Sequence, residues 1–342
     1  MIRLFMHQHT KLLLALALLG SFLVGFSLPL LTQSITASML ARCDAEHPLL
    51  NPSQRCGRKK TGTQEEYDVF ARQLAASLSQ KERSGDIAHT SVYFRDLENG
   101  PWFGLEEDET FSAASLLKLP ILMAVYKQAE HDPSLLQKKI GYTGTLGDTP
   151  NLSNPTQTIQ PGEYYTIDEL VGRMIIYSDN ASKELVQAWL SSLNHQQDLL
   201  TKTYADLGIF DATNSLDSRI TVKTYASIFR QLYNASYLTE EYSQKALSLL
   251  TRVEFKEGLN AGVPPDVTIA HKFGVREGKK GEFQLHDCGI VYHPVFPYLL
   301  CIMTRGQDAS HDASVIAEIS SHMYQEVLHR ALAAFQVQHR GK

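Results

Sequence analysis

Hydrophobic and polar positions along the chain predict a folded domain that opens with a helix and a β-hairpin. Residues 65–80 carry apolar side chains at helical spacing, and residues 90–96 then alternate like a strand before a turn at Asn99-Gly100. Residues 102–105 are the predicted hairpin partner of this strand. The hairpin therefore places two strands near the start of the domain.

The middle of the domain is helical and its end is strand-like. Helical patterns occupy residues 116–128, 167–176, 181–193, 222–233 and 242–250. Strand-like runs follow over 267–273, 282–292 and 297–304, and a last helix is predicted over 313–335. Strands at both ends with helices between them predict an α/β (α+β) fold. In it, an antiparallel five-stranded sheet is flanked by helices and an inserted helical subdomain.

The N-terminus has the pattern of a membrane anchor. Arg3 and Lys11 precede an uncharged stretch over residues 12–31, which spans about 30 Å as a helix, the thickness of the hydrocarbon core of a bilayer. No basic residue follows until Arg42, so the positive-inside rule places the N-terminus in the cytoplasm and the rest outside. A cleaved signal peptide is the alternative, and the domain is exported in either case.

The predicted organisation is thus a single-pass protein of the cell membrane with an extracytoplasmic domain. Its parts are a cytoplasmic N-terminus (1–11), a transmembrane signal anchor (12–31), a polar linker (32–64) and the folded domain (65–342). The net charge of -5 and the lack of a compact basic block argue against a nucleic-acid partner.

Four cysteines in an exported chain permit disulfides. Cys43 and Cys56 could close a small loop in the linker. Cys288 and Cys301 lie on two predicted strands joined by a turn, so they either face each other across a hairpin or form two buried thiols. Metal or cofactor spacings such as Cys-x-x-Cys, His-Glu-x-x-His or a glycine-rich phosphate loop do not occur, so no metal or cofactor is expected.

Ser115-Leu116-Leu117-Lys118 is a candidate for nucleophilic chemistry. Positions i and i+3 of a helix share a face, so Lys118 can reach the Ser115 hydroxyl, a weak nucleophile that needs a base. Burial among leucines favours the neutral lysine amine, which can accept the proton. Pro120 lacks an amide hydrogen, so a distorted helix start is predicted. The alternative is a surface serine that begins a helix.

Two further motifs follow along the chain. Ser-Asp-Asn at 178–180 directly precedes the helical pattern of 181–193, and all three residue types are good helix N-caps. A capping cluster is therefore the simplest interpretation of this motif alone. Lys-Phe-Gly at 272–274 lies at the end of a predicted strand and carries little information by itself.

The order of these three motifs resembles a known family. Ser-x-x-Lys after a hairpin, then Ser-Asp-Asn before a helix, then Lys-x-Gly on a strand is the signature of class A β-lactamases and penicillin-binding proteins. The similarity extends to the hairpin at 92–100, the helix start at 167–170 and the strand at 287–291. It covers residue 65 to the C-terminus and implies a β-lactamase/transpeptidase-like fold.

The resemblance implies a role for each matching residue. Ser115 attacks a lactam or peptide carbonyl with Lys118 as its base. Ser178 passes a proton toward the leaving nitrogen, and Lys272 supplies positive charge near Ser178 and the substrate carboxylate. Asn180 hydrogen-bonds the substrate amide.

The same resemblance also assigns the backbone around these side chains. Asp179 braces the loop that carries the Ser-Asp-Asn motif. The backbone amides of Ser115 and Val275 form the oxyanion hole, and Gly274 belongs to the same substrate-binding strand.

Two positions depart from the family pattern. Class A enzymes have a glutamate in the loop after Ser-Asp-Asn, which activates the water that clears the acyl-enzyme, but residues 204–219 contain none. Asp206, Asp211 and Asp217 are shorter candidates, and each is more typical of a loop or capping carboxylate. Phe273 replaces the usual threonine or serine and cannot donate a hydrogen bond to a substrate carboxylate. Its ring either lines the site or points into the core.

The sequence therefore predicts an exported β-lactamase-like serine hydrolase that attacks a lactam or peptide amide through a Ser115 acyl-enzyme. A D,D-peptidase-like cell-wall enzyme is the first alternative, because it uses the same nucleophile without the class A glutamate. A non-catalytic penicillin-binding or sensing module is the second alternative. Arg276 and Arg305 are candidate contacts for a substrate carboxylate. The expected partners are a β-lactam or peptidoglycan-peptide-like substrate and the membrane.

Overall fold

The computed structural model describes residues 47–52, 63–98, 100–144, 157–193, 198–209, 218–278 and 281–340. The predicted anchor at 12–31, the Cys43 and Cys56 pair, Asp211 and Asp217 lie outside these residues. Within the described ranges, no helix combines the length and the apolar character needed to cross a bilayer.

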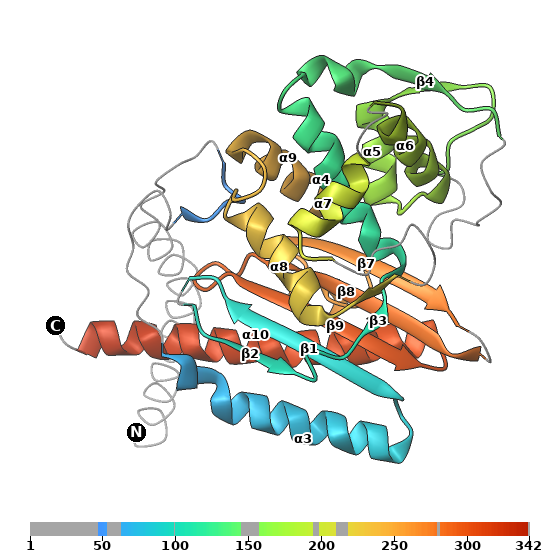
Figure 1. Ribbon diagram of the computed structural model, residues 1–342. Coiled ribbons are helices and arrows are strands. Elements are labelled where there is room, and N and C mark those ends of the chain that lie inside the picture. Colours follow the sequence, from blue (N-terminus) through green and yellow to red (C-terminus); the bar gives the residue numbers. More distant parts are fainter. Residues whose placement is uncertain are drawn as a thin grey trace, which may run out of the picture. The chain divides into compact units, whose positions relative to one another are not determined.

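A five-stranded antiparallel sheet forms the centre of the fold (Figure 1). Its strands are β1 (His89–Asp96), β2 (Trp102–Leu105), β7 (Ile269–Glu277), β8 (Phe283–Val291) and β9 (Tyr298–Gly306). Their order is β2-β1-β9-β8-β7, so the hairpin from the start of the domain meets the strands from its end where β1 pairs with β9. The predicted sheet, built from both ends of the domain, is confirmed.

Each face of the sheet is covered by helices because side chains alternate along the strands. Val92 and Phe94 of β1 pack with α3 (Asp68–Ser84) and α10 (Ala309–Arg340) in one buried cluster. Tyr93, between them, belongs to a second cluster with α8 (Val222–Tyr233). Figure 1 shows α3 and α10 on one side of the sheet and α8 on the other.

The helices of the predicted inserted subdomain pack beyond α8 (Figure 1). They are α4 (Lys118–Ala129), α5 (Ile167–Ile176), α6 (Asn180–Leu193), α7 (Leu199–Asp206) and α9 (Glu240–Leu250). The short 3-10 helices are η1 (Gln64–Tyr67), η2 (Ala114–Leu117), η3 (Pro133–Gln137) and η5 (Asn260–Gly262). Two small sheets pair β3 (Phe111–Ser112) with β6 (Arg219–Ile220) and β4 (Lys139–Gly141) with β5 (Tyr164–Thr166).

Most of these helices were predicted, and the differences have local causes. The expected distortion near Pro120 is observed as a 3-10 turn, η2, before the α-helical part starts at Lys118. The helix α7 was not predicted because its eight residues are too few to display a clear period. The small two-stranded sheets are shorter still.

Part of the predicted linker contacts the folded unit. The backbone amide of Asn51 donates to the carbonyl of Tyr233 at 2.8 Å, and the Tyr292 hydroxyl donates to the carbonyl of Leu49 at 3.0 Å. Leu50 is buried in the same core cluster as α8. Residues 47–52 therefore belong to the packed unit.

A disulfide joins the two central strands. Cys288 on β8 and Cys301 on β9 are direct cross-strand partners, and both side chains are fully buried. Of the two alternatives that the sequence left open, the structure has the disulfide. Cys288 is also the cross-strand partner of Lys272 on β7, so the disulfide and Lys272 share one face of the sheet.

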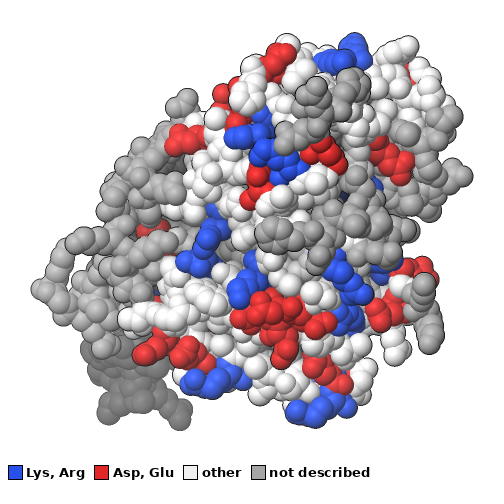
Figure 2. Space-filling model, viewed as in Figure 1, with Lys and Arg blue, Asp and Glu red and all other residues white. Residues whose placement is uncertain are grey.

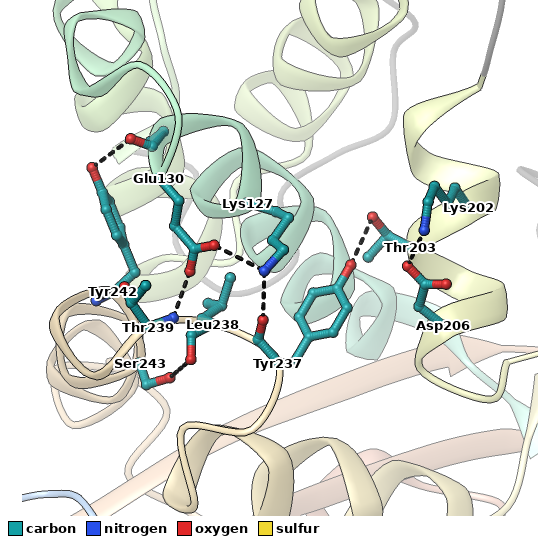
Figure 3. Close-up of polar contacts among 11 residues, drawn as sticks. Lys127, Glu130, Lys202, Thr203, Asp206, Tyr237, Leu238, Thr239, Tyr242 and Ser243 are labelled. Carbon is teal, nitrogen blue, oxygen red and sulfur yellow. Dashed lines mark hydrogen bonds and ion pairs between the residues drawn. The ribbon is translucent and has the colours of Figure 1, made fainter.

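A polar network joins the far end of α4 to the start of α9 (Figure 3). Lys127 Nζ lies 2.8 Å from Glu130 Oε2 and 2.8 Å from the carbonyl oxygen of Tyr237. Glu130 also accepts a hydrogen bond from the backbone amide of Thr239, the N-cap residue of α9, at 2.5 Å. The end of α4 that is remote from Lys118 is thereby tied to the neighbouring helix.

The molecular surface carries charges of both signs. Figure 2 shows acidic and basic side chains in neighbouring groups, with uncharged areas between them. Among the described residues on this face, basic side chains are interspersed with acidic ones.

Candidate active site

A buried serine hydroxyl between two lysines is the centre of the site. Ser178 Oγ lies 3.0 Å from Lys118 Nζ and 3.0 Å from Lys272 Nζ. The three residues come from the start of α4, the loop before α6 and strand β7, and their exposed fractions are 1% for Lys118, 3% for Ser178 and 0% for Lys272. The fold therefore brings together one residue from each of the three sequence motifs.

Lys118 makes further contacts with the Ser-Asp-Asn motif. Its Nζ donates to Asn180 Oδ1 at 2.7 Å and to the carbonyl oxygen of Ser178. Ser115, the predicted nucleophile, lies in η2 three residues before Lys118 and is half-buried. Among the described residues, Lys118 is hydrogen-bonded to Ser178 and Asn180 and not to Ser115. Contacts between nucleophile and base are often loose before substrate binds.

The two lysines have lowered pKa values because they are buried together. Burial lowers the pKa of Lys118 well below its ordinary value, and the positive charge of Lys272 lowers it further. Burial also lowers the pKa of Lys272 to about 7, against the opposing charge of Asp287. The lowered pKa favours the neutral amine of Lys118, the form that can accept a proton from a serine.

The loop that presents Ser178 is fixed by Asp179. The Thr158 hydroxyl donates to Asp179 Oδ1 at 2.7 Å, and the backbone amide of Ser182 donates to Oδ2 at 2.9 Å. The Ser182 hydroxyl also donates to Oδ2, and Asp179 is fully buried. Ser178 itself has a φ of 54°, a left-handed conformation that costs a non-glycine residue about 1 kcal/mol. The hydrogen bonds of Asp179 hold this conformation.

Gly274 allows strand β7 to approach the backbone of the nucleophile. A Cβ at this position would lie 3.2 Å from the amide nitrogen of Leu116 and 3.3 Å from that of Ser115. Val275 follows on β7 and is half-buried. The two residues whose amides were predicted to form the oxyanion hole, Ser115 and Val275, therefore lie on two elements that are in contact.

Phe273 lies beside the lysine pair without providing a hydroxyl. Its ring is buried and stacks on Phe255, with ring centroids 4.3 Å apart and planes 17° apart. Lys272 Nζ lies 4.2 Å from the centroid of the same ring. Of the two orientations that the sequence left open, the structure has the buried one, and the ring also shields the Lys272 ammonium group.

The two arginines that were candidates for a substrate carboxylate contact the β3 region. Arg276 Nη1 donates to Ser112 Oγ at 3.3 Å. Arg305 Nη2 lies 2.6 Å from Glu109 Oε1, and its guanidinium group covers the ring of Phe111 at 4.4 Å. Arg305 is thereby committed to a carboxylate of the protein itself.

A buried histidine and aspartate support β7 beside Lys272. His271 Nδ1 lies 2.8 Å from Asp287 Oδ1, and His271 Nε2 lies 2.7 Å from Asn260 Nδ2. An amide nitrogen only donates, so Nε2 accepts and the Nδ1 hydrogen points to the aspartate. Asp287 Oδ2 accepts from the backbone amide of Leu259 at 3.0 Å. The carboxylate is thus fully engaged and anchors the loop before β7.

Asp206 was the one described aspartate among the three proposed substitutes for the class A glutamate. It is exposed at the end of α7 and forms an ion pair with Lys202 at 2.7 Å.

A different carboxylate, Glu184, lies one helical turn after Asn180 on α6 and is half-buried. Its negative charge raises the pKa of Lys118, so it lies near the lysine pair. The i, i+4 spacing from Asn180 was the sequence signal for Glu184, and our sequence analysis missed it.

Within the described part of the chain, no group of three or more histidine, cysteine, aspartate or glutamate residues is arranged to hold a metal ion.

A five-stranded antiparallel sheet with an inserted helical subdomain and a Ser-x-x-Lys helix start facing a Ser-Asp-Asn loop defines the class of active-site-serine β-lactamases and penicillin-binding proteins. The chain belongs to the beta-lactamase enzyme family, whose model matches residues 70–327. No curated protein matches the sequence.

Solved structures with the same fold include PBP-A and class A β-lactamases. PBP-A is 22% identical with a TM-score of 0.61, and the match covers 74% of this chain and 94% of PBP-A. A class A β-lactamase from Mycobacterium abscessus is 21% identical with a TM-score of 0.60, over 73% of this chain and 98% of that enzyme. A variant of the last common ancestor of Gram-negative bacteria β-lactamase class A is 23% identical with a TM-score of 0.63, over 75% and 99%.

Proposed function

We propose that this protein is an exported serine hydrolase that opens a lactam or peptide amide through an acyl-enzyme on Ser115. The observation that carries the proposal is the position of Ser178 Oγ, 3.0 Å from each of two buried lysine nitrogens. Once Lys118 has taken a proton, the Ser178 oxygen can accept from both lysines, which leaves its own hydrogen to be donated to a third atom. That third atom is the leaving nitrogen of the substrate.

Acylation then proceeds as a proton relay. Lys118 takes the proton of Ser115 while Ser115 Oγ bonds to the carbonyl carbon of the substrate. The carbon–nitrogen bond breaks as Ser178 gives its proton to the leaving nitrogen, and Lys118 returns the first proton to Ser178. Lys272 holds Ser178 in place and contributes positive charge. The backbone amides of Ser115 and Val275 stabilise the oxyanion, an effect worth about 3 to 4 kcal/mol per donor in such enzymes.

The substrate class is supported by the fold relatives. A mutant of PBP-A was solved as an acyl-enzyme complex with penicillin G. Penicillin is therefore a suitable first probe for a covalent adduct on Ser115. A D,D-peptidase-like activity on cell-wall peptide is the second candidate, and the lack of a glutamate in residues 204–219 favours it.

Export is supported by two features of the chain. The uncharged stretch at 12–31 follows basic residues, as in a signal anchor. The Cys288–Cys301 disulfide is typical of proteins outside the cytoplasm. We propose a single-pass membrane protein with the hydrolase domain outside. Protease accessibility of the domain in intact cells tests this topology, and a domain that is protected until the cells are lysed contradicts it.

Intact-mass spectrometry with benzylpenicillin over time tests the serine chemistry. We expect a mass increase equal to the penicillin that is absent in the Ser115→Ala variant. Rapid loss of the adduct, with turnover of a chromogenic cephalosporin, indicates a β-lactamase. Release of D-alanine from a pentapeptide indicates a peptidase, and an adduct that persists for hours without either activity indicates a penicillin-binding sensor. An adduct that also forms on Ser115→Ala removes Ser115 as the nucleophile.

A further inference from the structure

Hydrolysis of an acyl-enzyme needs a base that accepts a proton from water. Among the described residues, the carboxylates whose charge raises the pKa of one of the two site lysines are Asp179 and Glu184 for Lys118 and Asp287 for Lys272. A carboxylate that activates water also has to be reachable by water.

Two of the three carboxylates are fully buried. Asp179 is fully buried and accepts hydrogen bonds from Thr158 and Ser182 on its two oxygens. Asp287 is fully buried and holds His271 and the backbone of the loop before β7. Neither carboxylate is therefore exposed to water.

Glu184 has the position and the exposure that a water-activating base requires. It follows Asn180 by four residues on α6, so both side chains lie on one face of the helix. Asn180 Oδ1 is 2.7 Å from Lys118 Nζ, which places this face of α6 against the lysine. Helical side chains lean toward the N-terminus of their helix, so the longer glutamate reaches back toward Asn180 and Lys118. Glu184 is half-buried, unlike Asp179 and Asp287.

We propose that Glu184 is the general base that activates water to hydrolyse the Ser115 acyl-enzyme. The proposal rests on the proposed function, because it requires that the acyl-enzyme forms. In class A enzymes a glutamate in the loop after Ser-Asp-Asn activates this water, and residues 204–219 contain no glutamate. The proposal assigns the same role to Glu184 on helix α6.

The step balances with the residues that are present. Glu184 removes a proton from water as the water oxygen bonds to the acyl carbonyl carbon. The tetrahedral intermediate then collapses, the bond between that carbon and Ser115 Oγ breaks, and the proton held by Glu184 returns to Ser115 Oγ. The products are a free carboxylic acid and the regenerated serine. Lys118, one turn from Ser115, is placed to pass this proton when Glu184 does not reach Ser115 directly.

Two rate constants, measured separately on the full-length protein, test the proposal. Benzylpenicillin is mixed with the wild type and with Glu184→Gln, and intact-mass spectra follow the appearance and the decay of the adduct. We expect the acylation rates to agree within about 3-fold and the decay of the adduct to slow by about 10²- to 10⁴-fold, the usual contribution of a general base. An unchanged acylation rate also shows that the variant is folded.

Asp206→Asn is the matched control, because it neutralises an exposed carboxylate on the neighbouring helix α7. We expect this variant to acylate and to deacylate like the wild type. Slow decay in Asp206→Asn with normal decay in Glu184→Gln would assign the base to Asp206 and overturn the proposal.

The remaining outcomes separate this inference from the proposed function. A wild-type adduct that decays no faster than the Glu184→Gln adduct overturns the role of Glu184 and leaves Ser115 acylation intact. Loss of acylation in Glu184→Gln while the wild type acylates shows that Glu184 acts on Lys118 and likewise overturns the proposal. Absence of any adduct on the wild type removes the proposed function and this inference together.

Discussion

Individual residues around the two lysines determine which part of the chemistry this site can perform. Lys118 and Lys272 are both buried and both contact one hydroxyl, and burial lowers both of their pKa values. Such a pair suits proton transfer, because burial makes it easier for each lysine to give up its proton. Lys272 and Ser178 each have a neighbour in sequence that affects the site. Phe273 shields Lys272 with its ring, and Asp179 holds the loop that carries Ser178.

The buried ring of Phe273 covers Lys272, whose Nζ lies 4.2 Å from the ring centroid. Phe273→Thr adds a hydroxyl and uncovers the lysine. We expect it to increase the acylation rate with benzylpenicillin by about 10-fold, the value of one hydrogen bond to a charged group. Stopped-flow or mass-spectrometric acylation rates measure this. Phe273→Leu is the control without a hydroxyl, and an equal gain in that variant contradicts the explanation.

Asp179 stabilises the left-handed backbone of Ser178 by hydrogen bonds from Thr158 and Ser182. Asp179→Asn replaces an acceptor by a donor and leaves one buried contact unmade. We expect the free energy of unfolding in urea to fall by about 1 to 3 kcal/mol. Thr158→Val removes only one of these bonds, so its loss should be smaller. Equal losses in both variants would show that the asparagine keeps the contacts with Ser182 and loses only the bond from Thr158.

At the level of elements, the active site is a junction between β7, the η2–α4 corner and the start of α6. Gly274 sets how closely β7 approaches η2, since any side chain there meets backbone nitrogen atoms at 3.2 to 3.3 Å. The other end of α4 is fixed by the network of Lys127, Glu130 and Thr239 (Figure 3). The helix that carries Lys118 is thus held at both ends.

Gly274→Ala tests the approach of β7 to the nucleophile. The new methyl group displaces the backbone of Ser115 by a few tenths of an ångström, which misplaces the nucleophile and an oxyanion donor. We expect acylation by benzylpenicillin to slow by about 10- to 100-fold. Gly172→Ala on α5 is the control, because nothing lies within 4 Å of a Cβ there. An acylation rate in Gly274→Ala equal to that of the Gly172→Ala control contradicts the argument.

Glu130→Gln tests the anchoring of α4 away from the site. The side chain of Glu130 is 9% exposed and accepts from Lys127 and from the amide of Thr239. We expect the free energy of unfolding to fall by about 1 kcal/mol, because the charge-assisted contacts of a mostly buried carboxylate are weakened. Asp206→Asn breaks the more exposed pair with Lys202 and should cost less stability than Glu130→Gln. A larger loss in the control contradicts this ranking.

At the level of the whole molecule, the buried lysines link stability to pH. The pKa of Lys272 is about 7 in the folded protein and 10.5 ordinarily, and the pKa values of Lys118 and Lys183 are also lowered by burial. The unfolded chain therefore binds more protons above pH 7, and the free energy of unfolding should rise as pH increases from about 7 to 10. Above pH 10, buried tyrosines such as Tyr204, whose pKa is raised by burial, reverse the trend.

Urea unfolding at pH 7, 8 and 9 measures this slope. Lys272→Met removes one titrating group, so we expect a flatter dependence that retains the contributions of Lys118 and Lys183. An equal slope in the variant would show that Lys272 remains charged in the folded protein. Acylation should change in the opposite direction, because the charge of Lys272 that supports Ser178 is lost above pH 7.

Local patterns in the sequence were sufficient to predict most helices and strands and to locate the three motifs. The helices at 167–176 and 222–233 were predicted with the observed bounds, because their amphipathic period is local information. The Ser-x-x-Lys spacing likewise predicted Ser115 as nucleophile and Lys118 as base, and these roles stay predictions. The motif order was sufficient to predict the family, which the family model over residues 70–327 confirms.

Only the tertiary structure decided which residues meet. Ser178 is 60 residues from Lys118 and 94 from Lys272 in sequence, yet both nitrogens contact its hydroxyl. The Cys288–Cys301 bond depended on the register of β8 and β9, because a shift of one residue would turn one of the two side chains to the other face. The orientation of Phe273 depended on packing against Phe255. Spacing along the chain determines the faces of helices and strands, whereas contacts between distant segments are fixed only when those faces pack.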